Sequence, residues 1–145
     1  MSLTVCHRPE TGLAIVRLDG RVTLEDHIRM IEAWLSPGSP LLTARAFIVD
    51  ARSLTAYDLG FSEMMRMSTR LSRAFAGLAE AMPFLLLVPD DWRFGMARMF
   101  QSLSGIVGNI DVHIYEREAD VLRACCLDIP RLDALWQDQS LPLAI

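Results

Sequence analysis

Lysine is missing from this sequence, and all 14 basic residues among its 145 are arginine. Mechanisms that need a side-chain amine are therefore excluded. Cysteine is scarce: there are three, and because Cys125 and Cys126 are adjacent, no disulfide framework is expected. The longest apolar stretch, AMPFLLLVP, is far shorter than the ~20 residues that cross a bilayer, and the N-terminus lacks the layout of a signal peptide. We expect a cytoplasmic protein with no membrane insertion.

An excess of positive charge is also absent. The net charge of −4 leaves no cationic footprint of the kind that a nucleic-acid partner requires, so none is expected. With 52% hydrophobic residues, the composition is that of a folded globular protein, and 145 residues suit one domain. We predict a single domain over 1–145, with its core at about 3–127 and a C-terminal extension at 128–145.

The motifs of common enzymes and metal sites do not occur. The glycines are isolated, so neither GxGxxG nor GxxxxGK[ST] is present, and there is no GxSxG elbow. The histidines His7, His27 and His113 have no Cys or His partner at metal-ligand spacing such as CxxC or HExxH. A lone histidine of this kind is usually structural. We therefore predict no catalytic residues, no metal and no cofactor, and we expect a protein that is not an enzyme.

The pattern of apolar runs predicts strands that alternate with helices. Thr23 and Asp26 have the spacing of a capping box, and SPGSP at 36–40 ends the helix that they start. Strands are predicted at 3–7, 13–18, 46–50, 84–88 and 112–115, and helices at 24–35, 59–81, from about 91, at 116–127 and at 130–138. This order, ββαβαβαβα, predicts an α/β fold with a mixed, mostly parallel sheet of about five strands and helices packed on it.

The stretch PDDWRFGMARMFQSL at 89–103 predicts a helix capped by Asp90 or Asp91. At 100° per residue, Phe94 and Arg98 lie on the outward face, four residues apart. They can form a cation–π pair worth ~0.5–1 kcal/mol when exposed. The same pair is also typical of an interface contact. The predicted core face consists of Trp92, Met96, Met99, Leu103, Ile106 and Val107.

Asp50 ends a buried strand, which is where a response-regulator receiver carries its phosphoacceptor. A receiver also needs an acidic pair after its first strand and a late lysine, and this sequence has neither. We therefore favour a structural carboxylate that accepts N–H bonds in its own loop. Open α/β sheets bind ligands at the carboxyl ends of their strands. The loops at 50–58 and 89–94 are accordingly the predicted functional edge.

Eight methionines are many for this length. Methionine fills irregular cores, and it also lines adaptable apolar sites. The core interpretation is favoured for most of them. The alternative is a narrow pocket for a lipid-like ligand between two helices, lined by Met64, Met67 and Met96.

Three segments resemble a STAS domain: LAIVRLDGRVTLED, AFIVDARSL and VPDDWRFGMARMF. The sequence is most similar to the SpoIIAA-like group, small stand-alone bacterial proteins related to anti-anti-sigma factors, over roughly residues 3–127. The resemblance implies a non-enzymatic regulatory domain that binds a protein partner, of unknown identity, through its strand-end loops and the adjoining helix. The residues expected to contact a partner or ligand are Asp50, Arg52, Ser53, Asp90, Asp91, Arg93, Phe94 and Arg98.

STAS switches carry a phosphorylatable serine directly after the aspartate, where this sequence has Ala51. Ser53 is only a displaced substitute, so the resemblance leaves open whether a phosphorylation switch is present. Relatives of the family that bind apolar ligands, with a fold that overlaps that of lipid-exchange proteins, support the pocket alternative. The carrier or sensor of a small apolar ligand is therefore the second predicted function.

The end of the chain, SLPLAI at 140–145, is apolar. An exposed apolar tail is a liability unless it is covered. Two arrangements would cover it. The tail folds back over its own domain near Phe94, or it packs against a second copy in a homodimer with a two-fold interface.

Overall fold

The computed structural model describes residues 2–137 and 142–144. Its centre is one sheet with the strand order β5-β4-β3-β2-β1-β6. The four strands β2 to β5 run parallel, whereas β1 is antiparallel to β2 and β6 is antiparallel to β1. The strands are β1 (Leu3–Arg8), β2 (Leu13–Thr23), β3 (Ala46–Asp58), β4 (Met82–Leu87), β5 (Ile110–Tyr115) and β6 (Pro142–Ala144).

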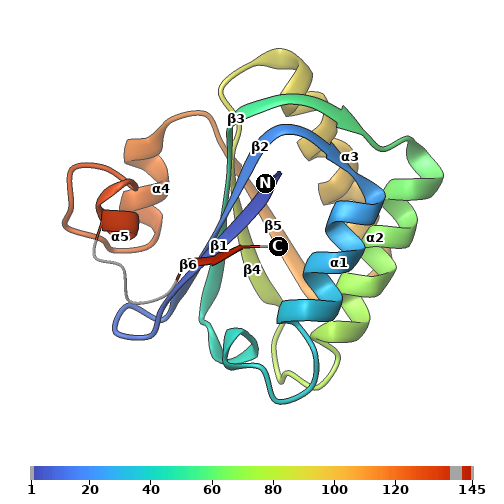
Figure 1. Ribbon diagram of the computed structural model, residues 1–145, viewed down its shortest axis with the longest axis horizontal. Coiled ribbons are helices and arrows are strands. Elements are labelled where there is room, and N and C mark those ends of the chain that lie inside the picture. Colours follow the sequence, from blue (N-terminus) through green and yellow to red (C-terminus); the bar gives the residue numbers. More distant parts are fainter. Residues whose placement is uncertain (1, 138–141, 145) are drawn as a thin grey trace.

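The sheet carries helices on both faces (Figure 1). Helices α1, α2 and α3 lie on one face, and α4 and α5 lie on the other. The helices are α1 (Leu24–Trp34), α2 (Phe61–Ala74), α3 (Asp91–Val107), α4 (Glu118–Ala124) and α5 (Ala134–Gln137), with a short 3₁₀ helix η1 (Pro40–Thr43). The predicted α/β class and the mixed, mostly parallel sheet are confirmed. The strands predicted at 46–50 and 84–88 are parallel neighbours in this sheet.

The predicted start of α1 is also confirmed. Asp26 N–H donates to Thr23 Oγ1 at 3.2 Å, and Thr23 N–H donates to Asp26 Oδ2 at 2.9 Å, which completes the capping box. The helix ends before the SPGSP segment, as its prolines and glycine predict. The side chains that α1 buries are His27, Met30, Ile31 and Trp34.

The predicted loop at 50–58 is wrong, because β3 continues as a strand to Asp58. Past Asp50 it pairs only with β2, and the two strands arch together over the helices of the first face (Figure 1). Register shifts place one extra residue on β3 at two points, and Gly20 at the second point has φ +61°. Bulges bend a strand and disturb the alternation of inward and outward side chains. That disturbance hid the strand from the sequence pattern.

Helix α2 is shorter than the predicted 59–81. It ends at Ala74, and Phe75 remains buried as its C-cap. A turn follows, in which Leu78 N–H donates to the Phe75 carbonyl at 3.1 Å. Phe61 and Leu78, which share one face of the predicted helix at 59–81 with the buried Met64 and Leu71, are exposed. The helical pattern extends past Ala74 because Phe75, directly after the helix, and Met82, at the start of β4, are both buried.

The predicted core face of α3 is correct at Leu103 and wrong at Trp92 and Ile106, while Met96 and Met99 are partly buried against the core. The helix buries Ala97, Phe100, Leu103 and Ser104, while Trp92 and Ile106 are exposed. Small side chains at 97 and 104 permit the helix to approach its neighbours closely, so this side faces inward despite its lower hydrophobicity. The prediction gave the large tryptophan priority over these small residues. Asp90, one of the two expected caps, accepts from Arg93 N–H at 3.3 Å.

The last two helices are both shorter than predicted. Helix α4 ends at Ala124 because Cys126 adopts φ +56°, and Leu127 N–H donates back to the Leu122 carbonyl at 2.9 Å. This is the 6→1 bond that closes a helix C-terminus. Helix α5 begins at Ala134, four residues later than predicted, and covers Ala134–Gln137; residue 138 of the predicted helix lies outside the described residues.

The chain end forms a short strand on its own domain. Backbone of β6 pairs with β1, with Leu143 opposite Val5. This is the far edge of the sheet from β4 and β5, so the predicted cover near Phe94 is wrong. The rest of the predicted tail, 140–141 and 145, lies outside the described residues. The homodimer stays a prediction.

Candidate functional site

Asp50 lies at the predicted functional edge, and in the structure its carboxylate is occupied by an ion pair with Arg52. Asp50 is buried, with 4% of its side chain exposed. The Arg52 guanidinium binds it with two bonds, Nε to Oδ1 at 3.0 Å and Nη2 to Oδ2 at 2.8 Å. Arg52 N–H also donates to Oδ1 at 3.0 Å, which is the local backbone bond expected for a structural carboxylate. The paired acceptors raise the pKa of Arg52 further above its ordinary value, mainly through the hydrogen bonds to Asp50.

The same arginine connects β3 to the second face. Arg52 Nη1 lies 3.0 Å from Glu118 of α4, whose carboxylate also accepts from Leu132 N–H at 3.2 Å. Arg17 of β2 reaches Asp133 at 3.1 Å, and its guanidinium lies 4.5 Å from the ring centre of Trp136. These groups attach α4 and α5 to the sheet. The cluster therefore has a structural role, because its two arginines are already paired with carboxylates of the same cluster.

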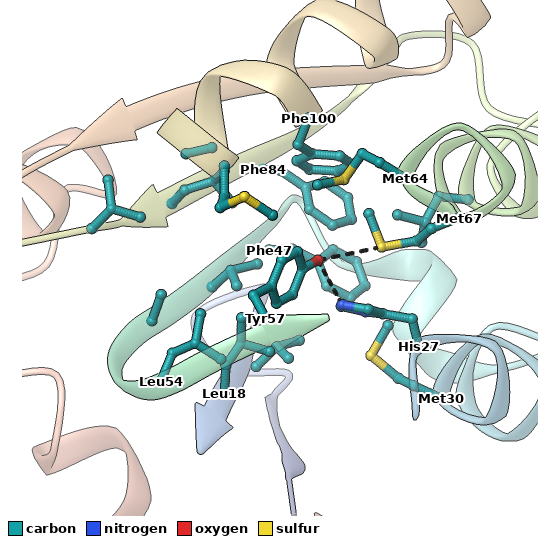
Figure 2. A pocket seen from close by; sticks show the side chains of 18 of the residues that line it. Leu18, His27, Met30, Phe47, Leu54, Tyr57, Met64, Met67, Phe84 and Phe100 are labelled. Atoms are coloured by element: carbon teal, nitrogen blue, oxygen red, sulfur yellow. Dashed lines mark hydrogen bonds between the residues drawn. The ribbon is translucent and has the colours of Figure 1, made fainter. Parts of the chain in front are cut away.

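The other face contains an apolar cavity, bounded by the sheet, helices α1 to α3 and the arch of β2 and β3 (Figure 2). About 90 Å³ of it is open to the centre of a water-sized sphere. Met64, Met67 and Met96, the residues of the alternative prediction, all line it. The wall is almost entirely apolar, and its remaining residues include Leu18, Met30, Phe47, Leu54, Phe84 and Phe100.

Four phenylalanines pack against one another at the base of this face. The rings of Phe47 and Phe84 stack with centroids 5.0 Å apart, and Phe75 meets both edge-on at 5.5 and 5.8 Å. Phe100 of α3 meets Phe84 at 6.2 Å. Such offset and edge-to-face pairs add stability beyond the area they bury. They make a rigid base for one side of the cavity.

Two polar side chains of the cavity wall bond to each other. The Tyr57 hydroxyl lies 2.7 Å from His27 Nε2 and donates to Met67 Sδ at 3.8 Å (Figure 2). Burial lowers the pKa of His27 from 6.5 to about 4, so the ring is neutral at pH 7. Burial also raises the pKa of Tyr57. His27 Nδ1 is buried and has no hydrogen-bond partner among the described residues.

Arg93 is the one permanently charged residue among those that line the cavity in the described part of the chain. Its side chain is 13% exposed. One terminal nitrogen pairs with Asp90, the other donates to the Leu54 carbonyl of β3, and the guanidinium lies 4.7 Å from the Trp92 ring centre. Its Nε–H is buried without an acceptor in the described residues.

The residues predicted to form one contact site are thus divided between places. Asp50 and Arg52 belong to the ion-pair cluster, and Ser53 is exposed on β3. Arg93 lines the cavity, whereas Asp90 and Asp91 are exposed at the start of α3.

The predicted outward pair of α3 is not formed as expected. Phe94 is partly buried against the core, and Arg98 is exposed. Ala51 is buried in the cavity wall.

Sequence reasoning missed the His27–Tyr57 pair. By its sequence context alone, His27 is predicted to be a lone structural histidine, which is a weak signal. Tyr57 was assigned to a loop, so nothing suggested that the two would meet across the cavity. A strand assignment at 51–58 would have provided that signal.

A scan against models of known protein families found no match for this sequence, and a search of curated proteins found no relative. Within residues 2–137 and 142–144, no helix is both long and apolar enough to cross a membrane. In the same part of the chain, no three His, Cys, Asp or Glu side chains gather as a metal site would require.

Proposed function

We propose that this chain is a non-enzymatic binding protein that carries or senses a small apolar ligand between its sheet and helices α1 to α3. The cavity supports this proposal, because folded interiors contain few voids larger than a water molecule. An empty void of this size costs stability, on the order of 2 kcal/mol at ~24 cal/mol per Å³. Contacts with a bound hydrocarbon would restore that loss.

The chemistry of the wall favours binding over catalysis. A water-sized group occupies ~10–15 Å³ of the same measure, so the space takes roughly six to nine such groups. Each buried methylene is worth ~0.8 kcal/mol, or roughly a fourfold gain in affinity. The polar side chains of the wall are a neutral histidine, a neutral tyrosine and one arginine. Burial raises the pKa of Tyr57, which disfavours the ionised hydroxyl that would act as a nucleophile.

Native mass spectrometry of freshly purified protein, followed by solvent extraction, tests this function. We expect a stoichiometric adduct that is released into the organic phase. We also expect affinity for straight-chain alcohols to rise with each added methylene until the cavity is full. An apo protein that binds no alcohol of any length would contradict the proposal.

A second candidate is the protein-interaction module of the STAS type. The element order ββαβαβαβα supports the assignment to that family. Two exposed aromatic side chains favour the function: Phe61 is 64% exposed at the start of α2, and Trp92 is 43% exposed at the start of α3. Aromatic residues are enriched among the side chains that dominate interfaces. A partner captured by the wild type and lost with Phe61→Ala and Trp92→Ala would support this candidate, and equal capture by all three would oppose it.

A further inference from the structure

We infer that the ligand of this cavity is an acid: a small amphiphile whose single carboxylate binds Arg93 and whose hydrocarbon end fills the space among the methionines. The inference rests on the proposed function, because it assigns the charge of the ligand held in the same cavity. It turns a general apolar binder into one with a defined ligand class.

Arg93 is held in place before any ligand arrives. Its guanidinium is fixed from three sides, by Asp90, by the Leu54 carbonyl and by the ring of Trp92. The planar fork of an arginine loses little further freedom when it binds a carboxylate, and charge-assisted bonds of this kind are about twice as strong as neutral ones. The Arg93 guanidinium is therefore preorganised to bind an anion.

The buried Nε–H of Arg93 has no acceptor in the described residues. A buried donor without a partner costs stability, and a neutral hydrocarbon would leave that cost unchanged. A carboxylate oxygen would accept this bond. The Asp90 carboxylate does not compete for this bond. It is 43% exposed at the start of α3, where it pairs with a terminal nitrogen of Arg93 and accepts from the Arg93 backbone N–H.

The charge of the ligand is not expected beside His27 and Tyr57. His27 is 7% exposed and neutral at pH 7, and Tyr57 is bonded to it at 2.7 Å. A carboxylate placed among these neutral groups and the surrounding methionines would lose its hydration without a cation to replace it. The hydrocarbon end therefore points to Met64 and Met67, and the acid end points to Arg93.

Titration calorimetry at pH 7.5 with octanoate and 1-octanol tests the assignment. The two probes share a chain length and differ in charge. We expect the wild type to bind octanoate at least tenfold more tightly than octanol. Arg93→Gln should weaken octanoate binding at least tenfold and octanol binding less than twofold. Arg98→Gln is the matched control, since Arg98 is exposed on the same helix and does not line the cavity; it should bind both probes as the wild type does.

Several results would overturn the inference. Equal or tighter binding of octanol by the wild type would show that the site does not select an acid. Equal weakening of both probes by Arg93→Gln, or equal effects of Arg93→Gln and Arg98→Gln on octanoate, would exclude a specific anchor. Should Arg93→Gln fail to fold, Arg93→Lys takes its place: it keeps the charge but lacks the Nε–H, so we expect its preference for octanoate over octanol to be smaller than that of the wild type. An Arg93→Lys variant with the wild-type preference would overturn the assignment of the carboxylate to the Nε–H of Arg93. Binding of neither probe by the wild type would overturn the proposed function as well, whereas binding of octanol alone would overturn only this inference.

Discussion

The two faces of the sheet differ in how they are closed. On the face of α4 and α5, a compact apolar cluster is sealed at its edge by the bonds of Arg52 and Arg17 to three carboxylates. On the face of α1 to α3, a larger apolar core retains a cavity beneath the arch of β2 and β3. The ion pairs of Arg17 and Arg52 thus stabilise the face of α4 and α5. The apolar residues of the other face form the candidate binding cavity.

This difference teaches that a charged strand end in an α/β sheet need not be the functional end. Asp50 is buried and each of its oxygens is bonded to Arg52, so its role is accounted for without a ligand. Two residues that line the cavity each have a buried polar atom without a partner in the described part of the chain, His27 Nδ1 and Arg93 Nε. In folded proteins such atoms call for an explanation. Variants of each face should therefore separate stability from binding.

The largest expected effect on stability is that of Arg52→Gln. Removal of the guanidinium leaves the buried Asp50 carboxylate and Glu118 without their cation. Breaking such a pair costs 3–5 kcal/mol when both partners are buried; because Arg52 is 35% exposed, we expect about 3 kcal/mol. Urea unfolding measures the loss. Octanol binding at the opposite face should remain within twofold of the wild type.

The double variant Asp50→Asn, Arg52→Gln provides the control. It removes the orphaned charge together with its partner, so it should be more stable than Arg52→Gln alone. A single variant as stable as the wild type, or one that loses octanol binding while still folded, would break the division between the faces.

The second effect is a loss of stability in mild acid that depends on His27. Its folded-state pKa of about 4 lies below the ordinary 6.5, so between these values the unfolded chain binds a proton that the folded chain excludes. The free energy of unfolding must therefore fall as the pH is lowered from 6.5 toward 4, by about 2 kcal/mol at pH 5. Unfolding by urea at a series of pH values measures this slope.

His27→Gln should flatten the slope between pH 6.5 and 5, because glutamine does not titrate. His113→Gln serves as the comparison, since His113 is exposed; its curve should follow that of the wild type. A slope that His27→Gln leaves unchanged would show that another group causes the acid sensitivity.

The smallest effect is expected at Ser53. This side chain is exposed on β3 and does not line the cavity. Exposed substitutions of this kind usually change stability by less than 0.5 kcal/mol. We expect Ser53→Ala and Ser53→Glu to match the wild type in both thermal melting and octanol binding. An altered affinity in Ser53→Glu would instead connect a charge at this position to the cavity.

The sequence predicted the sheet well, because its signals are local. The capping box of Thr23 and Asp26, the apolar run at 84–88 and the prolines at 36–40 each specify structure within a few residues. The methionines of the cavity were also named, as an alternative to simple core packing. What remained open was whether they enclose a space, since that depends on how closely three helices approach the sheet.

The errors arose where distant segments decide the outcome. β3 beyond Asp50 is a strand because β2 pairs with it through two bulges, and bulges erase the period-2 pattern. The inward face of α3 is set by the small Ala97 and Ser104 that allow close packing. The contact between His27 and Tyr57 joins residues 30 positions apart through that unpredicted strand. None of these features has a local signature.

The most direct test of the central claim is a binding isotherm for 1-octanol measured on a cavity-filled variant. Ala51 is buried in the cavity wall, whereas Ala79 is exposed in the turn after α2. Ala51→Leu and Ala79→Leu add the same atoms in these two places, and thermal melting verifies that both fold. We predict that the wild type and Ala79→Leu bind octanol alike and that Ala51→Leu binds it at least tenfold more weakly. A folded Ala51→Leu that binds octanol as the wild type does would contradict a binding site on this face of the sheet.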